Sequence, residues 1–220
     1  MSSLAHRWTC CAVTLLLGCS VKVFALSDAA PSGPLTAAVE ALTQPEPSAQ
    51  RQRAWRRLQL ASVYFEQGHP DVAMQEVRAA LRIDPQDAQA FNLLGLIHHQ
   101  RHADDLAEQS FQQALKLAHR DPASRDTLAS VAHNYGWFLC ERGQFAQGQH
   151  LLTQALTLPV APAVSGHTFK TWLVLGDCQQ QAGQTTQARH SWRQALTLEP
   201  HNPWLQKRLS AVAADSLSVE

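Results

Sequence analysis

Beyond residue 47 the chain repeats one pattern of apolar and polar residues. Pairs of segments carry apolar side chains three and four positions apart, which is the spacing of one helix face, and a short polar turn separates the two segments of each pair. A small residue recurs in the first segment at 61, 95, 136 and 176, at intervals of 34, 41 and 40 residues. No stretch shows the alternation typical of strands. The pattern therefore predicts an all-α fold of about four helical hairpins.

The last copy of the pattern is the most complete. Trp172 and Gly176 occupy its first segment, Gly183 its turn, Trp192 its second segment and Pro200 its end. This order is that of the tetratricopeptide repeat, a hairpin of about 34 residues whose copies stack into a solenoid. The predicted tetratricopeptide domain covers residues 48–215, with repeats at 54–87, 88–121, 129–162 and 169–202 and a C-terminal capping helix at 203–214.

Residue size and backbone freedom explain the recurring positions. A small side chain at 61, 95, 136 or 176 lets the two helices of a hairpin approach closely while larger apolar residues fill the remaining space. Gly68, Gly143 and Gly183 suit the left-handed conformation that ends a helix before a turn. The intervals of 41 and 40 residues exceed 34 by seven and six, and we place these additional residues in the linkers between repeats.

The N-terminus resembles a bacterial export sequence. A basic start precedes an apolar stretch that ends in Leu-Leu-Gly-Cys19, which resembles the lipobox, where the cysteine is lipidated and becomes the mature N-terminus. We therefore expect a signal peptide at 1–18, lipidation of Cys19 and a flexible tether rich in Ser and Pro at 19–47. Cleavage after Ala25 is the alternative that the sequence leaves open.

The charge balance narrows the classes of partner. Of 220 residues, 18 are Lys or Arg and 18 are Asp or Glu, so the formal net charge is zero. Nucleic-acid-binding domains usually carry a basic surface, so we expect no nucleic-acid partner. The longest uncharged apolar run, 8–21, is shorter than the about 20 residues of a membrane-spanning helix, so membrane attachment is expected through the lipid anchor.

Two of the five cysteines are expected to form a disulfide. Cys10 and Cys11 would leave with the signal peptide and Cys19 would carry the lipid, which leaves Cys140 and Cys178. These two lie near the ends of the first helices of adjacent repeats, and an exported protein meets oxidising conditions. Two separate buried thiols remain the alternative, because bridging requires Cα atoms within about 7 Å of each other.

The sequence gives only weak indications of a catalytic or metal site. His98, His99 and His102 form an H-H-x-x-H cluster without the glutamate of H-E-x-x-H zinc enzymes, and we interpret them as surface histidines at an exposed helix end. No G-x-S-x-G, glycine-rich phosphate loop or C-x-x-C motif occurs. The aromatic residues around Cys140 indicate burial rather than an activated nucleophile. We therefore predict a protein that is not an enzyme and uses no metal, cofactor or small-molecule substrate.

Binding is expected on the concave face of the repeat stack. In tetratricopeptide stacks, positions two, five, nine and twelve of each first helix line this face, counted with the small residue as position eight. These positions hold Trp55, Leu58, Ser62 and Phe65; Gln89, Asn92, Leu96 and His99; Ser130, His133, Trp137 and Cys140; and Lys170, Leu173, Asp177 and Gln180. The predicted partner-binding residues among them are Asn92, Leu96, His99, His133, Trp137, Leu173 and Asp177. Burial of Trp55 and Phe65 under the tether or a neighbouring helix is the alternative.

One short sequence indicates a particular family among proteins with this repeat. Residues 134–140 have the sequence Asn-Tyr-Gly-Trp-Phe-Leu-Cys, Gly143 follows, and Gly-Asp-Cys178 lies on the next repeat. With the lipobox upstream, the chain resembles the PilW (also called PilF) family of type IV pilus biogenesis and stability lipoproteins over residues 50–200. The resemblance implies a scaffold, lipid-anchored on the periplasmic face of the outer membrane, that binds a secretin subunit or another pilus-assembly component. An adaptor for another cell-envelope machine, such as cell-wall synthesis or a different secretion system, is the alternative.

Overall fold

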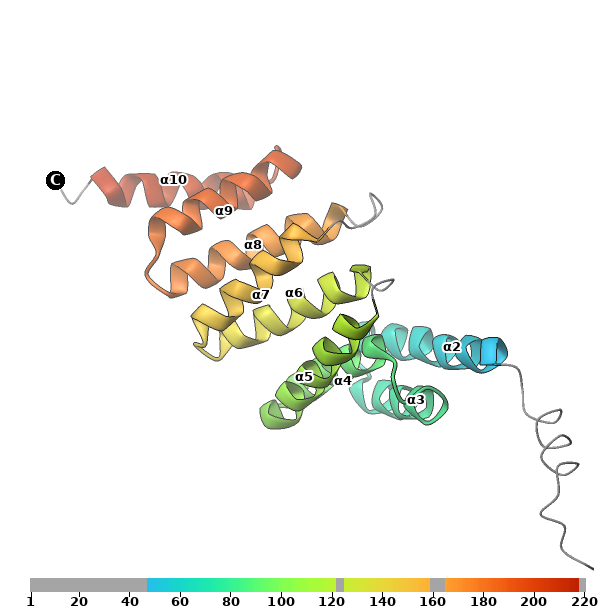
Figure 1. Ribbon diagram of the computed structural model, residues 1–220. Helices are drawn as coiled ribbons and strands as arrows, with labels where there is room; N and C mark the ends of the chain where they lie inside the picture. Colours follow the sequence, from blue (N-terminus) through green and yellow to red (C-terminus); the bar gives the residue numbers. More distant parts are fainter. Residues whose placement is uncertain (1–46, 122–124, 159–164, 218–220) are drawn as a thin grey trace, which may run out of the picture. The chain divides into compact units, whose positions relative to one another are not determined.

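The computed structural model describes residues 47–121, 125–158 and 165–217 (Figure 1). No strand occurs in these ranges, and none of their helices is both long and apolar enough to cross a membrane. The predicted all-α fold is confirmed. The signal peptide, Cys19 and most of the tether lie outside the described residues. The helices are α2 (Pro47–Glu66), α3 (Pro70–Ile83), α4 (Ala88–Gln100), α5 (Asp104–Arg120), α6 (Arg125–Glu141), α7 (Phe145–Thr157), α8 (Ser165–Gln181), α9 (Thr185–Leu198) and α10 (Pro203–Leu217).

Successive helices pair into hairpins, α2 with α3, α4 with α5, α6 with α7 and α8 with α9. The first helices α2, α4, α6 and α8 also contact one another in this order. The second helices α3, α5 and α7 pack instead against the first helix of the next hairpin. This arrangement puts the first helices on one face of the stack, which is the architecture of a tetratricopeptide solenoid, as the sequence predicts.

The observed helix bounds differ from the predicted repeats at the start of three first helices. Helix α2 begins at Pro47 rather than at 54, α6 at Arg125 rather than at 129, and α8 at Ser165 rather than at 169. As a result α6 and α8 each have 17 residues, whereas α4 has 13. Part of the additional sequence that we placed in the linkers therefore lengthens helices.

A left-handed residue follows the first helix of every hairpin. Gly68, Gly143 and Gly183 have φ angles of 78°, 74° and 75°, as their place before a turn predicts. His102 takes the corresponding place after α4, with a φ angle of 57°. The left-handed conformation costs a residue with a Cβ atom about 1–2 kcal/mol. The packing of the α4–α5 hairpin must offset this cost.

The small residues of the first helices lie directly beneath large side chains of the second helices. A Cβ atom added at Gly95 would lie 2.7 Å from the nearest atoms of the Phe111 ring. At Gly136 it would lie 2.9 Å from both Leu152 Cγ and the carbonyl oxygen of Gly148. Phe111 and Leu152 are fully buried. The lack of a side chain at these points therefore sets how closely the two helices of a hairpin can approach.

A disulfide joins the third and fourth hairpins. Cys140 at the end of α6 is bonded to Cys178 in α8, with 2.07 Å between the sulfur atoms and 5.5 Å between the Cα atoms. The Cα separation lies within the about 7 Å that bridging allows. Both cysteines are buried in a cluster with Leu152 and Leu175. The two first helices are thus held side by side by a covalent bond.

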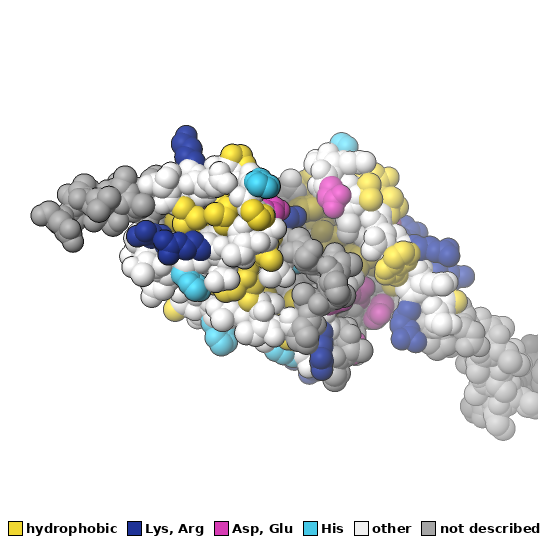
Figure 2. All heavy atoms as spheres, turned by 90° about the horizontal axis from the view of Figure 1, so that it is seen from above, with side chains coloured by type: hydrophobic (Ala, Val, Ile, Leu, Met, Phe, Trp, Pro, Cys, Tyr) yellow, Lys and Arg dark blue, Asp and Glu magenta, His cyan; other side chains and the backbone are white. Residues whose placement is uncertain are grey.

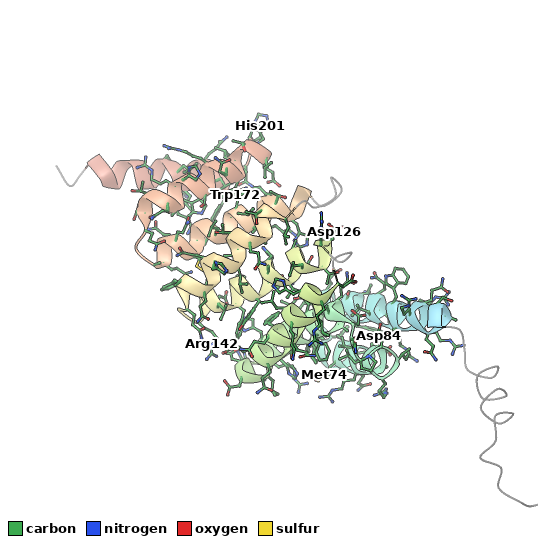
Figure 3. All side chains as sticks on the ribbon, in the orientation of Figure 1. Met74, Asp84, Asp126, Arg142, Trp172 and His201 are labelled. Carbon is green, nitrogen blue, oxygen red and sulfur yellow. A yellow bond between two sulfur atoms is a disulfide. The ribbon has the colours of Figure 1, made fainter. Side chains whose placement is uncertain are left out.

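Helix α10 covers the C-terminal end of the stack. Its Leu205 is fully buried against Trp192 and Ala195 of α9. Trp172, labelled in Figure 3, packs against this cluster and also against the cluster around the disulfide. The helix predicted at 203–214 therefore does cap the last hairpin.

We expect Gly136→Ala to lower the free energy of unfolding by about 1–3 kcal/mol, because the new Cβ atom would meet a backbone carbonyl that cannot rotate away. Urea unfolding followed by circular dichroism measures this change. Gln147→Ala, at an exposed position of α7, is the control and should change that free energy by less than about 0.5 kcal/mol. Equal stability of Gly136→Ala and the wild type would contradict the close approach of α6 and α7.

The disulfide closes a loop across a sequence separation of 38 residues. Loss of that restraint on the unfolded chain costs up to about 4 kcal/mol. We expect the double variant Cys140→Ala/Cys178→Ala to show a destabilisation approaching this size in urea, and the reduced wild type to behave similarly. Thiol titration of protein purified under oxidising conditions should find no free thiol at either position, and two reactive thiols would count against the bridge.

Candidate functional site

The first helices surround a hollow of about 470 Å³, which we call the inner groove. Its apolar lining comes from Leu58, Phe65, Leu93 and Leu96. An apolar lining with a small number of placed polar groups is typical of binding sites. The polar lining residues are Gln59, Ser62, Glu66, Gln89, Asn92, Ser130, His133, Asn134, His167 and Lys170.

Side-chain amides join α4 to α6 along the inner groove. Gln89 Nε2 donates to Thr127 Oγ1 at 3.0 Å, and Asn134 Nδ2 donates to Asn92 Oδ1 at 3.2 Å. Each amide carries two N–H donors and one carbonyl acceptor, so the NH₂ group of Asn92 and the carbonyl of Asn134 keep capacity for a ligand. A donor and an acceptor side by side match the hydrogen-bonding groups of a peptide backbone.

His133 presents a hydrogen-bond acceptor at the inner groove. Its Nδ1 lies 2.9 Å from Thr171 Oγ1, and that hydroxyl donates to the carbonyl oxygen of His167 at 2.8 Å. Because the hydroxyl proton is used there, His133 Nδ1 donates to Thr171, and His133 Nε2 keeps its lone pair. Burial, with smaller effects of His167 and Lys170, lowers the pKa of His133 from 6.5 to about 4. The ring is therefore neutral at neutral pH.

Formal charge is sparse in the inner groove and lies on its outermost helices. Glu66 belongs to α2 and Lys170 to α8, and both side chains are exposed. Burial lowers the pKa of His167 and of His133, so neither ring adds positive charge at neutral pH. The described lining thus combines uncharged hydrogen-bonding groups with one acidic and one basic residue on opposite walls.

Three of the seven predicted partner-binding residues line the inner groove, namely Asn92, Leu96 and His133. The other four lie outside its lining and contact other parts of the chain; they are His99, Trp137, Leu173 and Asp177. Trp55 is 55% exposed, and no described helix covers it.

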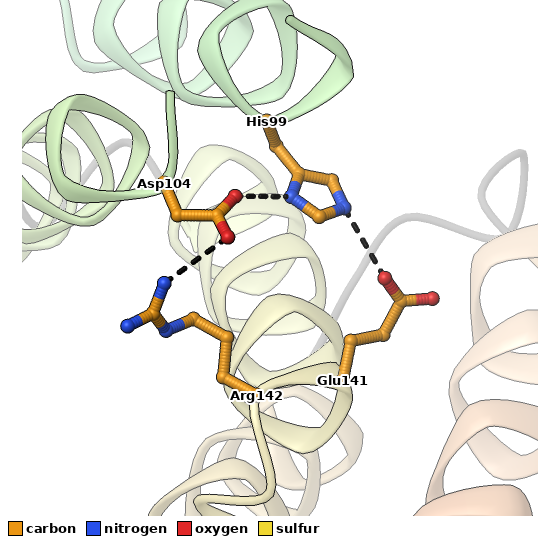
Figure 4. Close-up of polar contacts among 4 residues, drawn as sticks. All are labelled: His99, Asp104, Glu141 and Arg142. Atoms are coloured by element: carbon orange, nitrogen blue, oxygen red, sulfur yellow. Dashed lines mark hydrogen bonds and ion pairs between the residues drawn. The ribbon is translucent and has the colours of Figure 1, made fainter. Parts of the chain in front are cut away.

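His99 links the second hairpin to the third (Figure 4). Its Nδ1 lies 3.1 Å from Asp104 Oδ1 and its Nε2 lies 3.2 Å from Glu141 Oε2. Arg142 lies 3.1 Å from the second oxygen of Asp104, and the Trp137 ring meets the imidazole edge-on with 5.0 Å between centroids. Only a protonated imidazole can donate to both carboxylates. The hydrogen bond from His99, aided by the charge of Arg142, lowers the pKa of Asp104.

Leu173 and Asp177 take part in the C-terminal cap. Leu173 packs against the cluster that contains Leu205. Asp177 accepts a hydrogen bond from Trp192 Nε1 at 3.1 Å and pairs with Arg208 of α10 at 3.1 Å. Burial raises the pKa of Asp177, and the charge of Arg208 opposes that shift. Both residues thus have intramolecular partners.

The sequence reasoning missed position six of the first helices. Gln59, Leu93 and Asn134 occupy this position and line the inner groove. Residues three and four places apart lie on one helix face, so positions five and six both follow position two on the concave side. Glu66, one residue beyond position twelve, and His167, three residues before position two, extend the same stripe. The helical period alone was sufficient to find them.

The interpretation of the H-H-x-x-H cluster as surface histidines is wrong for His98. This side chain is 9% exposed because position eleven faces the preceding hairpin, and burial, aided by the charges of Arg78 and Arg101, lowers its pKa. Helix α4 ends at Gln100, so His102 lies beyond the helix and shares no face with His98. No group of three or more His, Cys, Asp or Glu side chains suited to a metal occurs in the described parts of the chain.

Known sequences that resemble this chain are also tetratricopeptide-repeat or type IV pilus proteins. Residues 58–124 match the tetratricopeptide-repeat family model. Over 146 residues the chain is 28% identical to the type IV pilus assembly protein PilF of Pseudomonas aeruginosa, covering 66% of this chain and 54% of PilF. The chain therefore spans about half the length of the curated relative it matches.

Two solved structures share the fold. P. aeruginosa PilF superimposes with a TM-score of 0.68 at 22% identity, covering 77% of this chain and 72% of PilF. PilW, described as a widely conserved type IV pilus biogenesis factor, superimposes with a TM-score of 0.61 at 27% identity, covering 72% of this chain and 68% of PilW. The resemblance to these proteins, predicted from the 134–140 run, is confirmed.

We expect stability to fall as the pH drops from about 6.5 to about 4, because His133 gains a proton in the unfolded chain but not in the folded protein. The sign follows from a folded-state pKa below the unfolded value. This residue alone accounts for about 3 kcal/mol across that range. His133→Gln should flatten the pH dependence of urea unfolding, whereas His150→Gln, at an exposed site of α7, should leave it unchanged. If the free energy of unfolding of His133→Gln changed with pH as steeply as that of the wild type, the burial of the neutral ring would be contradicted.

Proposed function

We propose that this tetratricopeptide-repeat protein, a relative of PilF and PilW, is a non-catalytic scaffold of type IV pilus biogenesis that binds an assembly component in its inner groove. The observation that carries the proposal is the groove itself, in a chain that is 27% identical to PilW across 72% of its length. Because the chain spans 54% of PilF, the pilus role is a proposal about this chain rather than a property transferred from that relative.

The lining of the inner groove favours a peptide segment with apolar side chains. Leu58, Phe65 and Leu96 offer apolar contacts, while the Asn92–Asn134 pair offers a donor and an acceptor to a peptide backbone. The wall charges favour a segment with a basic residue towards α2 and an acidic residue towards α8. A secretin subunit is the partner that we propose for this segment.

We place the protein on the periplasmic face of the outer membrane, anchored by lipid on Cys19. The Leu-Leu-Gly-Cys19 sequence supports lipidation, and the residues that follow it to position 47 would act as a tether. The Cys140–Cys178 disulfide supports an oxidising compartment, because such bonds are rare in the cytosol.

We expect Lys170→Glu to weaken binding of the secretin subunit by about tenfold, because it would place a second acid at the inner groove and repel an acidic residue of the partner. Titration of the purified secretin subunit measures this change. Lys116→Glu is the matched control, since it makes the same charge change at an exposed site of α5 outside the groove lining. Equal weakening by both variants would show that net charge, and not the groove, governs binding.

A strain that lacks the protein tests the pilus role as a whole. We expect it to lose heat-stable secretin multimers and surface pili, and the gene for Lys116→Glu to restore both. The gene for Lys170→Glu should restore them less well. Normal multimers and normal pili in the deletion strain would remove the proposed function.

A further inference from the structure

Helix α2 concentrates positive charge at the N-terminal end of the described solenoid. Arg51, Arg53, Arg56 and Arg57 lie within seven consecutive residues, and the helix has no acidic residue before Glu66. The formal net charge of the whole chain is zero, so this cluster is a local feature.

Three of these arginines point to solvent without an ionic partner. Arg57 pairs with Glu76 of α3 at 2.8 Å. Arg51, Arg53 and Arg56 are exposed, and within the described ranges no carboxylate lies at ion-pair distance from any of them. Their charges are therefore available to an anionic partner.

Large apolar side chains are exposed on the same helix. Trp55, Leu60 and Val63 have 55%, 42% and 47% of their surface exposed. In the second hairpin the residue that corresponds to Val63, at an interval of 34, is Ile97, which is fully buried against the preceding hairpin. Val63 thus occupies a packing position that no described residue covers.

The exposed apolar and basic residues share one side of α2. At about 100° per residue, Val63, Arg56, Leu60 and Arg53 span an arc of roughly 80°, and Trp55 lies about 80° beyond Val63, past Glu66 and Gln59 at the edge of the inner groove. Lys and Arg side chains gather with apolar side chains over this end of the molecule in Figure 2. Exposed arginines beside a tryptophan and aliphatic side chains combine the two attractions that hold a protein at an anionic membrane surface, which are burial of apolar area and electrostatic attraction to the lipids.

We infer that this face of α2 docks on the surface of an anionic phospholipid bilayer. The arginines match the phosphates and negative charge of the headgroups, and the Trp55 ring has the amphipathic character that favours the interfacial region. A bilayer fits better than an acidic protein helix, because the long arginine side chains and the indole can adapt to a broad arc without a shaped groove. Helix α2 is also the first described element after the predicted tether, so it is the part of the solenoid that follows the expected lipid anchor most directly.

The experiment uses the full-length chain with Cys19→Ser, so that no acyl chain contributes to binding. Vesicles of phosphatidylcholine alone, or with added phosphatidylglycerol, are titrated, and vesicle-bound protein is measured by sedimentation. We expect binding to the anionic vesicles that weakens with added salt. Each arginine contributes roughly fivefold, so Arg53→Gln/Arg56→Gln should reduce partitioning by about 25-fold.

The control double variant Arg189→Gln/Arg193→Gln removes the same amount of charge from α9 and has the same N-terminal residues, including the predicted signal peptide. It should bind the anionic vesicles like the parent chain. Trp55 fluorescence, isolated by comparison with Trp55→Phe, should shift to shorter wavelength with anionic vesicles. Equal binding by both double variants would overturn the inference. Capture of polyglutamate in place of anionic vesicles, with the same dependence on Arg53 and Arg56, would also overturn it.

Discussion

The contact between a glycine on one helix and a large buried side chain on the next is the constraint on which the rest of the solenoid depends. Gly95 beneath Phe111 and Gly176 beneath Trp192 leave no room for even a methyl group. Because this contact recurs in the second, third and fourth hairpins, these hairpins keep similar internal geometry and can stack in series. The first helices then share one side, and the inner groove follows from that alignment.

Polar and covalent links, in addition to apolar packing, hold one first helix to the next. The His99–Glu141 contact and the Asn92–Asn134 bond join α4 to α6. The bond of His133 to Thr171 and the disulfide join α6 to α8. A polar link has narrow limits of distance and angle, so these contacts fix the rotation between hairpins more tightly than aliphatic packing alone. The shape of the groove depends on that rotation.

The sequence was sufficient for features that depend on local chemistry. Residue size at 61, 95, 136 and 176 and the turn glycines predicted the hairpins, and the apolar residues of 203–214 predicted the cap. Whether a given concave-face residue lines the groove depends on the rotation between hairpins and on the additional turns of α6 and α8. The sequence of a single segment specifies neither of these. For this reason Asn92, Leu96 and His133 line the inner groove as predicted. His99 instead contacts carboxylates of α5 and α6, and Asp177 pairs with Arg208 of the capping helix. The turn at His102 carries no glycine, so the sequence did not indicate that α4 ends before it.

The position of the disulfide divides the solenoid into halves that differ in how they can open. In a linear array each hairpin contacts only its neighbours, so it can in principle separate from the stack independently. The Cys140–Cys178 bond removes that independence from the third and fourth hairpins, which must move as one body together with their cap. The first and second hairpins have no such bond between them in the described ranges. One side of the inner groove therefore belongs to α6 and α8, which a covalent bond joins, and the other to α2 and α4, which the described structure holds by non-covalent contacts.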